Sequence, residues 1–122
     1  MNPYSEIVQE HYRHPRNFGA LEKPDIRHEL ANPLCGDRVR IEVALADDGR
    51  VRAARFQGDL CSIAKAAASL LTELIVGRTL DALPDEQQLV DALRTELKPS
   101  RRKCALLPLD ALRAGADAFT RR

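Results

Sequence analysis

The sequence predicts one α+β domain, and three patterns support that prediction. Apolar and polar residues alternate from Val39 to Leu45, which is typical of a strand with one buried face. Asp48-Gly49 then turns the chain into a second run of this kind, so residues 39–57 predict a β-hairpin. Elsewhere, apolar residues recur every three or four positions, as in helices that bury one face. At 122 residues, the chain suits a single domain, 1–122.

The N-terminal segment predicts a helix followed by a loop. Asn2 is a suitable cap with Pro3 at the first helical position, and Pro15 ends the helix. The face at helical spacing consists of Tyr4, Ile7, Val8 and His11. Residues 16–24 predict a loop, and residues 26–30 predict a short or edge strand.

The return strand of the hairpin, residues 51–57, carries a predicted irregularity. Phe56 is out of phase with Val51 and Ala53, so we expect a β-bulge near Ala53-Ala54.

A second helix is predicted from Ser62 to Gly77. Its apolar face consists of Ile63, Ala67, Leu70, Leu71, Leu74 and Ile75. We expect Ser62 to be the N-cap. Cys61 would then lie just outside the helix N-terminus, where the partial positive charge favours the thiolate.

Two further helices are predicted in the last third of the chain. Asp85 and Gln88 resemble a capping box, and Pro99 is expected to end that helix, whose apolar face is Leu89, Leu93 and Leu97. Pro108 is expected to start the last helix. The basic stretch between them leads into Cys104 and consists of Lys98, Arg101, Arg102 and Lys103.

Composition limits the setting and the partners. The 19 basic and 18 acidic residues leave a net charge of +1, which does not suggest nucleic acid or a membrane. The three cysteines are an odd number, no apolar leader follows Met1, and no apolar run is long enough for a bilayer span. We therefore expect a cytoplasmic, reducing setting and thiols used for metal or sulfur chemistry. Inert buried cysteines are the alternative.

The segment Asn32-Pro33-Leu34-Cys35-Gly36-Asp37 places a thiol and a carboxylate two residues apart on an irregular turn. With Cys61 and Cys104 it supplies three soft donors and one hard donor, a set that suits tetrahedral zinc or an iron–sulfur cluster. The cysteines are too far apart in sequence for a local CxxC knuckle, so only the fold can assemble them. Taken alone, a Gly-Asp pair after a turn favours capping of backbone amides by Asp37 over ligation.

Four groups of residues run in register with a known family from about Tyr4 to Leu112. They are Tyr4-Ser5-Glu6 with His11-Tyr12 and Pro15-Arg16-Asn17, the segment 32–37, Cys61-Ser62-Ile63, and Arg102-Lys103-Cys104-Ala105. In these the chain resembles the IscU/SufU family, which is related to the N-terminal domain of NifU. The resemblance implies a three-stranded antiparallel sheet packed against several helices, with a metal site at one exposed end. It also implies iron–sulfur cluster assembly with sulfur from a cysteine desulfurase.

By that resemblance, Cys35, Asp37, Cys61 and Cys104 would bind iron or a [2Fe-2S] cluster as a scaffold, which passes its cargo to apo-proteins or SUF machinery. The alternative is a SufU-like zinc protein, in which Cys35 accepts persulfide from a SufS-type desulfurase. Either is a scaffold or sulfur acceptor rather than a stand-alone enzyme.

Lys103 bears on the choice between these functions. It stands where IscU scaffolds carry a histidine, and it cannot ligate because a protonated lysine has no lone pair. This resembles SufU, whereas the interval from Cys61 to Cys104 has the IscU-like length. Arg102 and Lys103 are expected to offset the negative charge of the ligands, or else to form a merely solvated face.

Two other classes of protein fit less well. A structural zinc module would have a closed, inert site, which the turn at Cys35 and the mixed ligand set disfavour. Nucleic-acid binding is disfavoured because no aromatic residues interleave the basic stretch, and a zinc hydrolase because no His-Glu pair lies on a helix.

Overall fold

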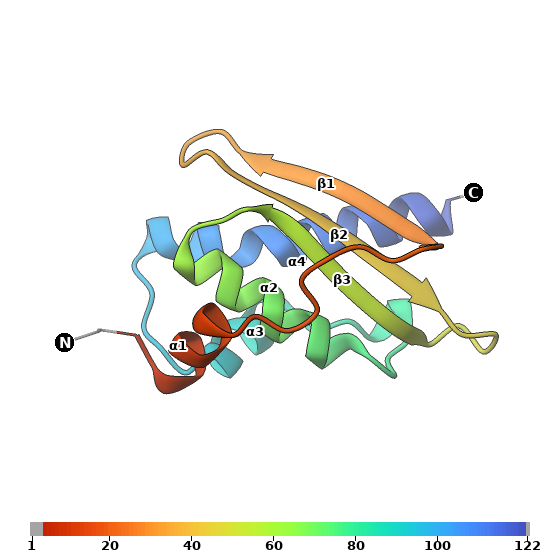
Figure 1. Cartoon of the computed structure of the whole chain (residues 1–122), viewed down its shortest axis with the longest axis horizontal. Helices are drawn as coiled ribbons and strands as arrows, with labels where there is room; N and C mark the ends of the chain where they lie inside the picture. The colour runs from red at the N-terminus through yellow and green to blue at the C-terminus, as the bar shows by residue number, and fades with distance from the viewer. Residues whose placement is uncertain (1–3, 122) are drawn as a thin grey trace.

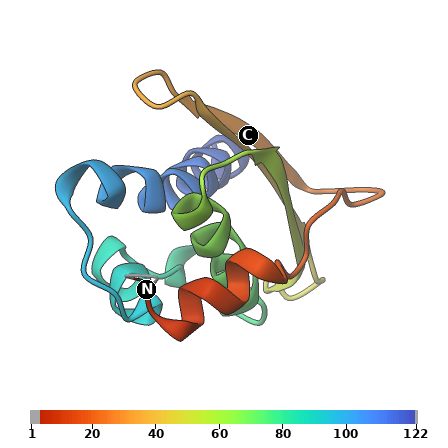
Figure 2. The same cartoon turned by 60° about the vertical axis from the view of Figure 1, so that its left-hand side comes forward.

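The computed structural model describes residues 4–121, which form a three-stranded sheet covered on one face by helices (Figures 1 and 2). The elements in chain order are α1 (Glu6–Arg13), β1 (Ile26–Asn32), β2 (Asp37–Leu45), β3 (Val51–Asp59), α2 (Ser62–Ile75), a 3-10 turn (Leu80–Ala82), α3 (Glu86–Leu93) and α4 (Pro99–Thr120). The sheet is antiparallel in the order β1-β2-β3. The predicted α+β class and the three-stranded sheet are confirmed.

The predicted hairpin is present, and its bulge lies one residue before the predicted position. Ala44 pairs with Ala53, whereas Leu45 pairs with Val51, so Arg52 is the extra residue on β3. This shift turns both Val51 and Phe56 toward the core although they are five positions apart.

The core lies between the sheet and the helices α2 and α4. α4 packs against β1 and β2, α2 packs against β3 and α4, and α1 packs outside α2. The largest buried side chains include Phe56, Ile41, Leu71, Leu109 and Leu112. Each contributes about 1.5–3 kcal/mol by its removal from water. A second cluster joins α1, α2 and α4 through Val8, Ile63 and Cys104, so one of the thiols is anchored in packed apolar surroundings.

The outer face of the sheet is partly covered by the segment between α1 and β1. Phe18 pairs with the edge of β3 beside Phe56, and the chain then crosses β2 (Figure 1). On the way, the N–H of Leu21 donates to Glu42 Oε1 at 2.7 Å. Glu42 is therefore 1% exposed, although its strand position predicts a polar outer face. Arg27 lies 3.3 Å from the other carboxylate oxygen and offsets its charge.

Two predicted helix starts differ from the structure. The predicted cap at Asn2-Pro3 lies outside the described residues, and α1 begins at Glu6 with Ser5 as its cap. The Ser5 hydroxyl accepts from the N–H of Val8 at 3.2 Å. The N-cap of α2 is Cys61 and not Ser62, which is the first helical residue. Pro15 follows the end of α1, as predicted.

The last two helices divide differently from the prediction. The capping box of Asp85 and Gln88 is confirmed, but α3 ends at Leu93 because Arg94 adopts a left-handed conformation with φ of 51°. Leu97 lies in the following loop. α4 then begins at Pro99, the tolerated first position for proline, and continues through Pro108. Pro108 removes one hydrogen bond, to the carbonyl of Cys104, and the long buried face of α4 offsets that loss.

None of the helices within residues 4–121 combines the length and apolar character that a membrane span requires.

Candidate metal centre

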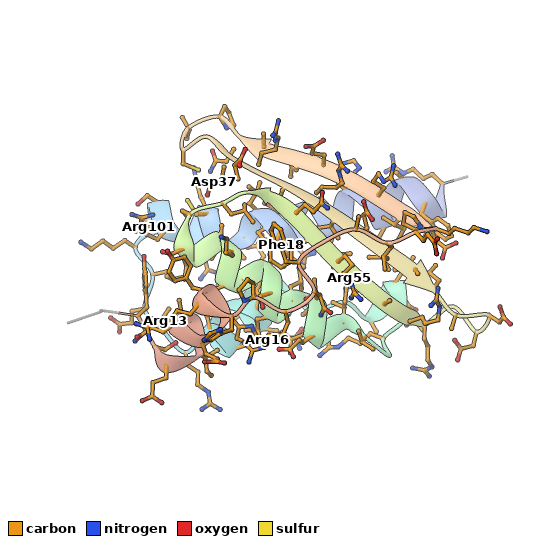
Figure 3. All side chains as sticks on the ribbon, in the orientation of Figure 1. Arg13, Arg16, Phe18, Asp37, Arg55 and Arg101 are labelled. Carbon is orange, nitrogen blue, oxygen red and sulfur yellow. The ribbon has the colours of Figure 1, made fainter. Side chains whose placement is uncertain are left out.

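The four predicted ligands come from three places at one end of the sheet. Cys35 lies exposed in the turn between β1 and β2, and Asp37 is the buried first residue of β2. Cys61 is the half-buried residue before α2, and Cys104 is buried in the second turn of α4. Figure 3 shows Asp37 at this end, on the same side as Arg101. The fold thus brings together residues from distant parts of the chain.

The turn that carries Cys35 is held by the end of the sheet. Asn32 pairs with Asp37, and the N–H of Gly36 donates to the Asn32 carbonyl at 2.9 Å. Gly36 has φ of 77°, a left-handed conformation that glycine adopts without strain. The Asn32 side chain accepts from the N–H of Leu34 at 3.0 Å. This arrangement presents the Cys35 thiol to solvent on a short, defined turn.

Asp37 has one carboxylate oxygen occupied and one free. Its Oδ1 accepts from the backbone N–H of Cys61 at 3.2 Å. Its Oδ2 is buried and has no hydrogen-bond partner among the described residues. An unpaired buried carboxylate oxygen is costly, and a bound cation would remove that cost. Asp37 therefore caps a backbone amide and keeps a second oxygen free, so capping does not exclude the predicted ligand role.

The thiols of Cys35 and Cys104 are already at ligand spacing. Their sulfur atoms lie 3.7 Å apart. Two thiolates on one tetrahedral zinc, each about 2.3 Å from the metal, are about 3.8 Å apart. One ligand atom each from Cys35, Asp37 and Cys104 lies within 4.8 Å of the other two. These three residues could hold a metal ion together.

Cys61 is adjacent to this group but is not part of the 4.8 Å set. Its backbone bonds Asp37, and its thiol interacts with both Asp37 and Cys104. It lies between the end of β3 at Asp59 and the start of α2 at Ser62, and its place as a fourth ligand stays a prediction.

Burial keeps two of the thiols protonated. Burial raises the pKa of Cys104 to about 12, with further contributions from the neighbouring Cys35 and Cys61. Burial also raises the pKa of Cys61, and the negative charge of Asp37 adds to that effect. The prediction that the helix N-terminus favours a Cys61 thiolate is therefore wrong for the metal-free protein. A hydrogen bond from the backbone of Ala64 does lower the Cys61 pKa, but the burial effect is larger.

Basic residues line the mouth of the site. A cavity of about 550 Å³ runs between the turn and the start of α4, and Cys35, Cys104, Arg101 and Lys103 are among its lining residues. Arg102 is half-buried and is not one of these lining residues. Within residues 4–121, none of these cations forms an ion pair. Arg101 and Lys103 lie where they can offset a negatively charged site, and for Arg102 this role stays a prediction.

Arg101 is the residue whose position sequence reasoning missed. It lines the cavity with Cys35 because it lies three residues before Cys104, on the same face of α4. The i, i+3 spacing was visible in the sequence, but it has this meaning only if the helix begins at Pro99.

The chain matches the family model described as the NifU-like N terminal domain over residues 3–122. It is 34% identical over 123 residues to the iron-sulfur cluster assembly scaffold protein IscU of Escherichia coli (strain K12), which covers 98% of this chain and 96% of that protein. It is 33% identical over 131 residues to the zinc-dependent sulfurtransferase SufU of Bacillus subtilis (strain 168), with 92% and 88% covered.

The fold is also that of solved structures. A structure described as an iron-sulfur cluster assembly scaffold protein for the SUF system, from Fervidobacterium islandicum AW-1, superposes with a TM-score of 0.80. The two chains share 24% sequence identity, and the match covers 93% of this chain and 96% of that one.

Proposed function

This chain belongs to the NifU-like N-terminal domain family, and from that premise we propose that it is a scaffold on which iron–sulfur clusters are assembled. The observation that carries the proposal is the pair of thiols 3.7 Å apart beside a buried, unpartnered carboxylate oxygen. The full-length likeness to the scaffold protein IscU supports it.

The cargo of the scaffold is iron and sulfide in the form of a [2Fe-2S] cluster. Its iron atoms are held by Cys35, Asp37 and Cys104, whose ligand atoms lie within 4.8 Å of one another, together with Cys61. The three thiolates are strong donors, and the Asp37 carboxylate is the hard, weaker one. A weaker fourth donor keeps the cargo exchangeable, as a protein that passes its cargo on requires. Arg102 and Lys103 offset the accumulated negative charge.

Cys35 is the residue best placed to receive sulfur. It is the exposed thiol of the three, and a partner can reach it on its turn. A Cys35 thiolate attacks the outer sulfur of a cysteine desulfurase persulfide, forms a persulfide on Cys35 and releases the desulfurase cysteine as a thiolate. A thiol reductant then supplies the two electrons that convert this sulfur to sulfide. Cytoplasmic placement follows from the need for reduced thiols.

A zinc-dependent sulfur relay is the second candidate. It is supported by Lys103, which cannot ligate, and by the likeness to the zinc-dependent sulfurtransferase SufU. The donor set fits zinc, because the 3.7 Å separation of the sulfur atoms matches tetrahedral ligation. Zinc bound by the same four residues would hold their thiols as thiolates at neutral pH. The sulfur would then leave from Cys35 without a cluster being formed.

One anaerobic assembly experiment separates the two candidates. Metal-stripped protein is mixed with a cysteine desulfurase, cysteine, ferrous iron and a thiol reductant, and visible charge-transfer absorbance is followed. A scaffold develops this absorbance, and Cys35→Ser reduces it. If none develops, but the zinc-loaded protein accelerates the desulfurase and gains sulfur on Cys35, the scaffold proposal fails and the relay stands.

A further inference from the structure

A groove runs along α4 beyond the metal centre. The cavity beside Cys35 and Cys104 shares Asn32, Leu34 and Lys103 with a second cavity of about 460 Å³. The second cavity continues between β1 and α4 as far as Asp110. We call the two together the α4 groove. It begins beside the thiols and ends two helical turns beyond Lys103.

The walls of the α4 groove are mostly apolar. They are formed by Leu30, Pro33, Leu34, Pro99, Leu106 and Leu107. Leu34 is 83% exposed at the tip of the turn, which makes it the most exposed of the large apolar side chains in residues 4–121. An exposed apolar surface beside polar groups is typical of an interaction site.

The two ends of the α4 groove carry opposite charge. Arg101 and Lys103 line the end beside the thiols, whereas Glu86 and Asp110 line the far end. Partial burial and repulsion from Glu86 raise the pKa of Asp110. No ion pair involves any of these four residues within the described chain. The groove thus carries charge of both signs outside any ion pair of the described chain, although the positive charge of Arg113 partly offsets that of Asp110.

We propose that the α4 groove binds an extended segment of a recipient protein that carries an acidic and a basic residue about three positions apart, with apolar residues between them. Lys103 and Asp110 are seven residues apart on one helix, which is about 10 Å. In the extended polyproline II conformation, three residues complete one turn and span about 9 Å, so side chains three positions apart lie on the same face. The acidic side chain meets Arg101 and Lys103, the basic one meets Glu86 and Asp110, and the apolar ones pack on Leu107 and Leu34.

This inference rests on the proposed scaffold function and names the recipient by its chemistry. A segment seated in the groove passes beside Cys35 and Cys104, where the cargo is held. The recipient's own ligands are then brought close to the iron before the scaffold releases it. Like-charged Glu86 and Asp110 repel each other, so a cation between them relieves that repulsion as well as pairing with both.

Binding of short peptides to the full chain tests the inference. The probe is fluorescein-labelled, amidated Gly-Asp-Val-Leu-Arg-Gly, compared with the same peptide carrying two Asp or two Arg residues. Fluorescence anisotropy at low salt is expected to show about fivefold tighter binding of the mixed peptide than of either control. Asp110→Lys is expected to move the preference to the two-Asp peptide. Glu86→Lys gives an independent version of that test, should the first variant fold poorly.

A matched control and three outcomes decide the matter. Asp47→Lys, which reverses a charge in the turn at the opposite end of the sheet, is expected to leave the order of the three peptides unchanged. Equal binding of all three peptides overturns the inference, and so does no binding at millimolar concentration. Sedimentation that shows a dimer dissociated by Asp110→Lys would also overturn it, because the occupant would then be a second copy of the chain.

Failure of this inference differs from failure of the scaffold proposal. Asp110→Lys is expected to form the visible cluster absorbance as well as the unaltered chain does, while its peptide preference changes. If the unaltered chain forms no cluster, the scaffold proposal fails whatever the peptides do. If it forms the cluster but does not distinguish the peptides, the recipient inference fails alone.

Discussion

The backbone N–H of Cys61 donates to Oδ1 of Asp37 at 3.2 Å, so a single carboxylate joins the start of β2 to the N-terminus of α2. The same carboxylate keeps its other oxygen buried and unpartnered. One side chain therefore positions a ligand and is itself available as one.

Removal of the Asp37 carboxylate should make the cluster harder to release. In Asp37→Ala the hard fourth donor is lost, so the cluster is retained by the thiolates alone. We expect transfer of iron to an external chelator to slow about tenfold, a barrier change of about 1.4 kcal/mol. The decay of the visible cluster absorbance measures the rate of this transfer. Asp59→Ala, at an exposed carboxylate, is the control, and equal decay in both variants would contradict the assignment.

Metal binding should release protons and strengthen with pH. The pKa values of Cys61 and Cys104 are raised, the latter to about 12, so both thiols are protonated at neutral pH and must ionise to bind. The protons released by these two thiols alone make the zinc affinity rise by at least about a hundredfold per pH unit below these pKa values. Calorimetry in buffers of different ionisation enthalpy counts the protons. Cys104→Ser should release one fewer, and an unchanged count would disprove the role of Cys104.

His11 should make the fold less stable in mild acid. Its Nδ1 lies 2.7 Å from Ser69 Oγ, and burial, reinforced by the Arg16 charge, lowers its pKa below 6.5. The neutral form is therefore favoured in the fold. The stability that neutral His11 contributes to the fold is fully present above pH 6.5. It is lost as the pH falls through the lowered pKa of His11 in the folded state. Urea unfolding across this range measures the loss.

The control for His11 is the exposed His14. His14→Asn should keep the pH dependence, whereas His11→Asn should flatten it and cost about 1 kcal/mol at neutral pH. If His11→Asn retains the full acid sensitivity, another group causes it.

Gly58 should be irreplaceable for the pairing of β3 with β2. It has φ of 151°, and a Cβ there would lie 1.9 Å from the Arg38 carbonyl oxygen. Gly58→Ala is expected to destabilise the protein by about 3 kcal/mol or more, because the backbone itself must shift. Gly49, with φ of 88° and open space around it, is the matched control and should lose only about 1 kcal/mol as alanine. Equal losses in urea unfolding would contradict the steric argument.

The sheet and α2 could be predicted from the sequence because each is specified by residues that lie close together in the chain. The alternation in β2, the Asp48-Gly49 turn and the displaced phase of Phe56 each specify structure within a few residues. The capping box before α3 is of the same kind.

The features that the sequence did not predict depend on tertiary contacts. Glu42 is buried only because the segment through Leu21 crosses the sheet. α4 continues through Pro108 because its apolar face is buried, and this places Arg101 on the side of Cys104. The ligand set came from the family resemblance together with the donor types, because no local spacing joins Cys35 to Cys104. The pKa of Cys61 was mispredicted because burial cannot be read from a helix terminus.

The iron and acid-labile sulfide content of the chain after anaerobic assembly tests the central claim most directly. The scaffold account predicts iron and sulfide bound in equal amounts, with Mössbauer spectra of a diamagnetic [2Fe-2S] centre, and loss of both in Cys104→Ser. Tightly bound zinc with sulfane sulfur on Cys35, and no bound iron or sulfide, would contradict it.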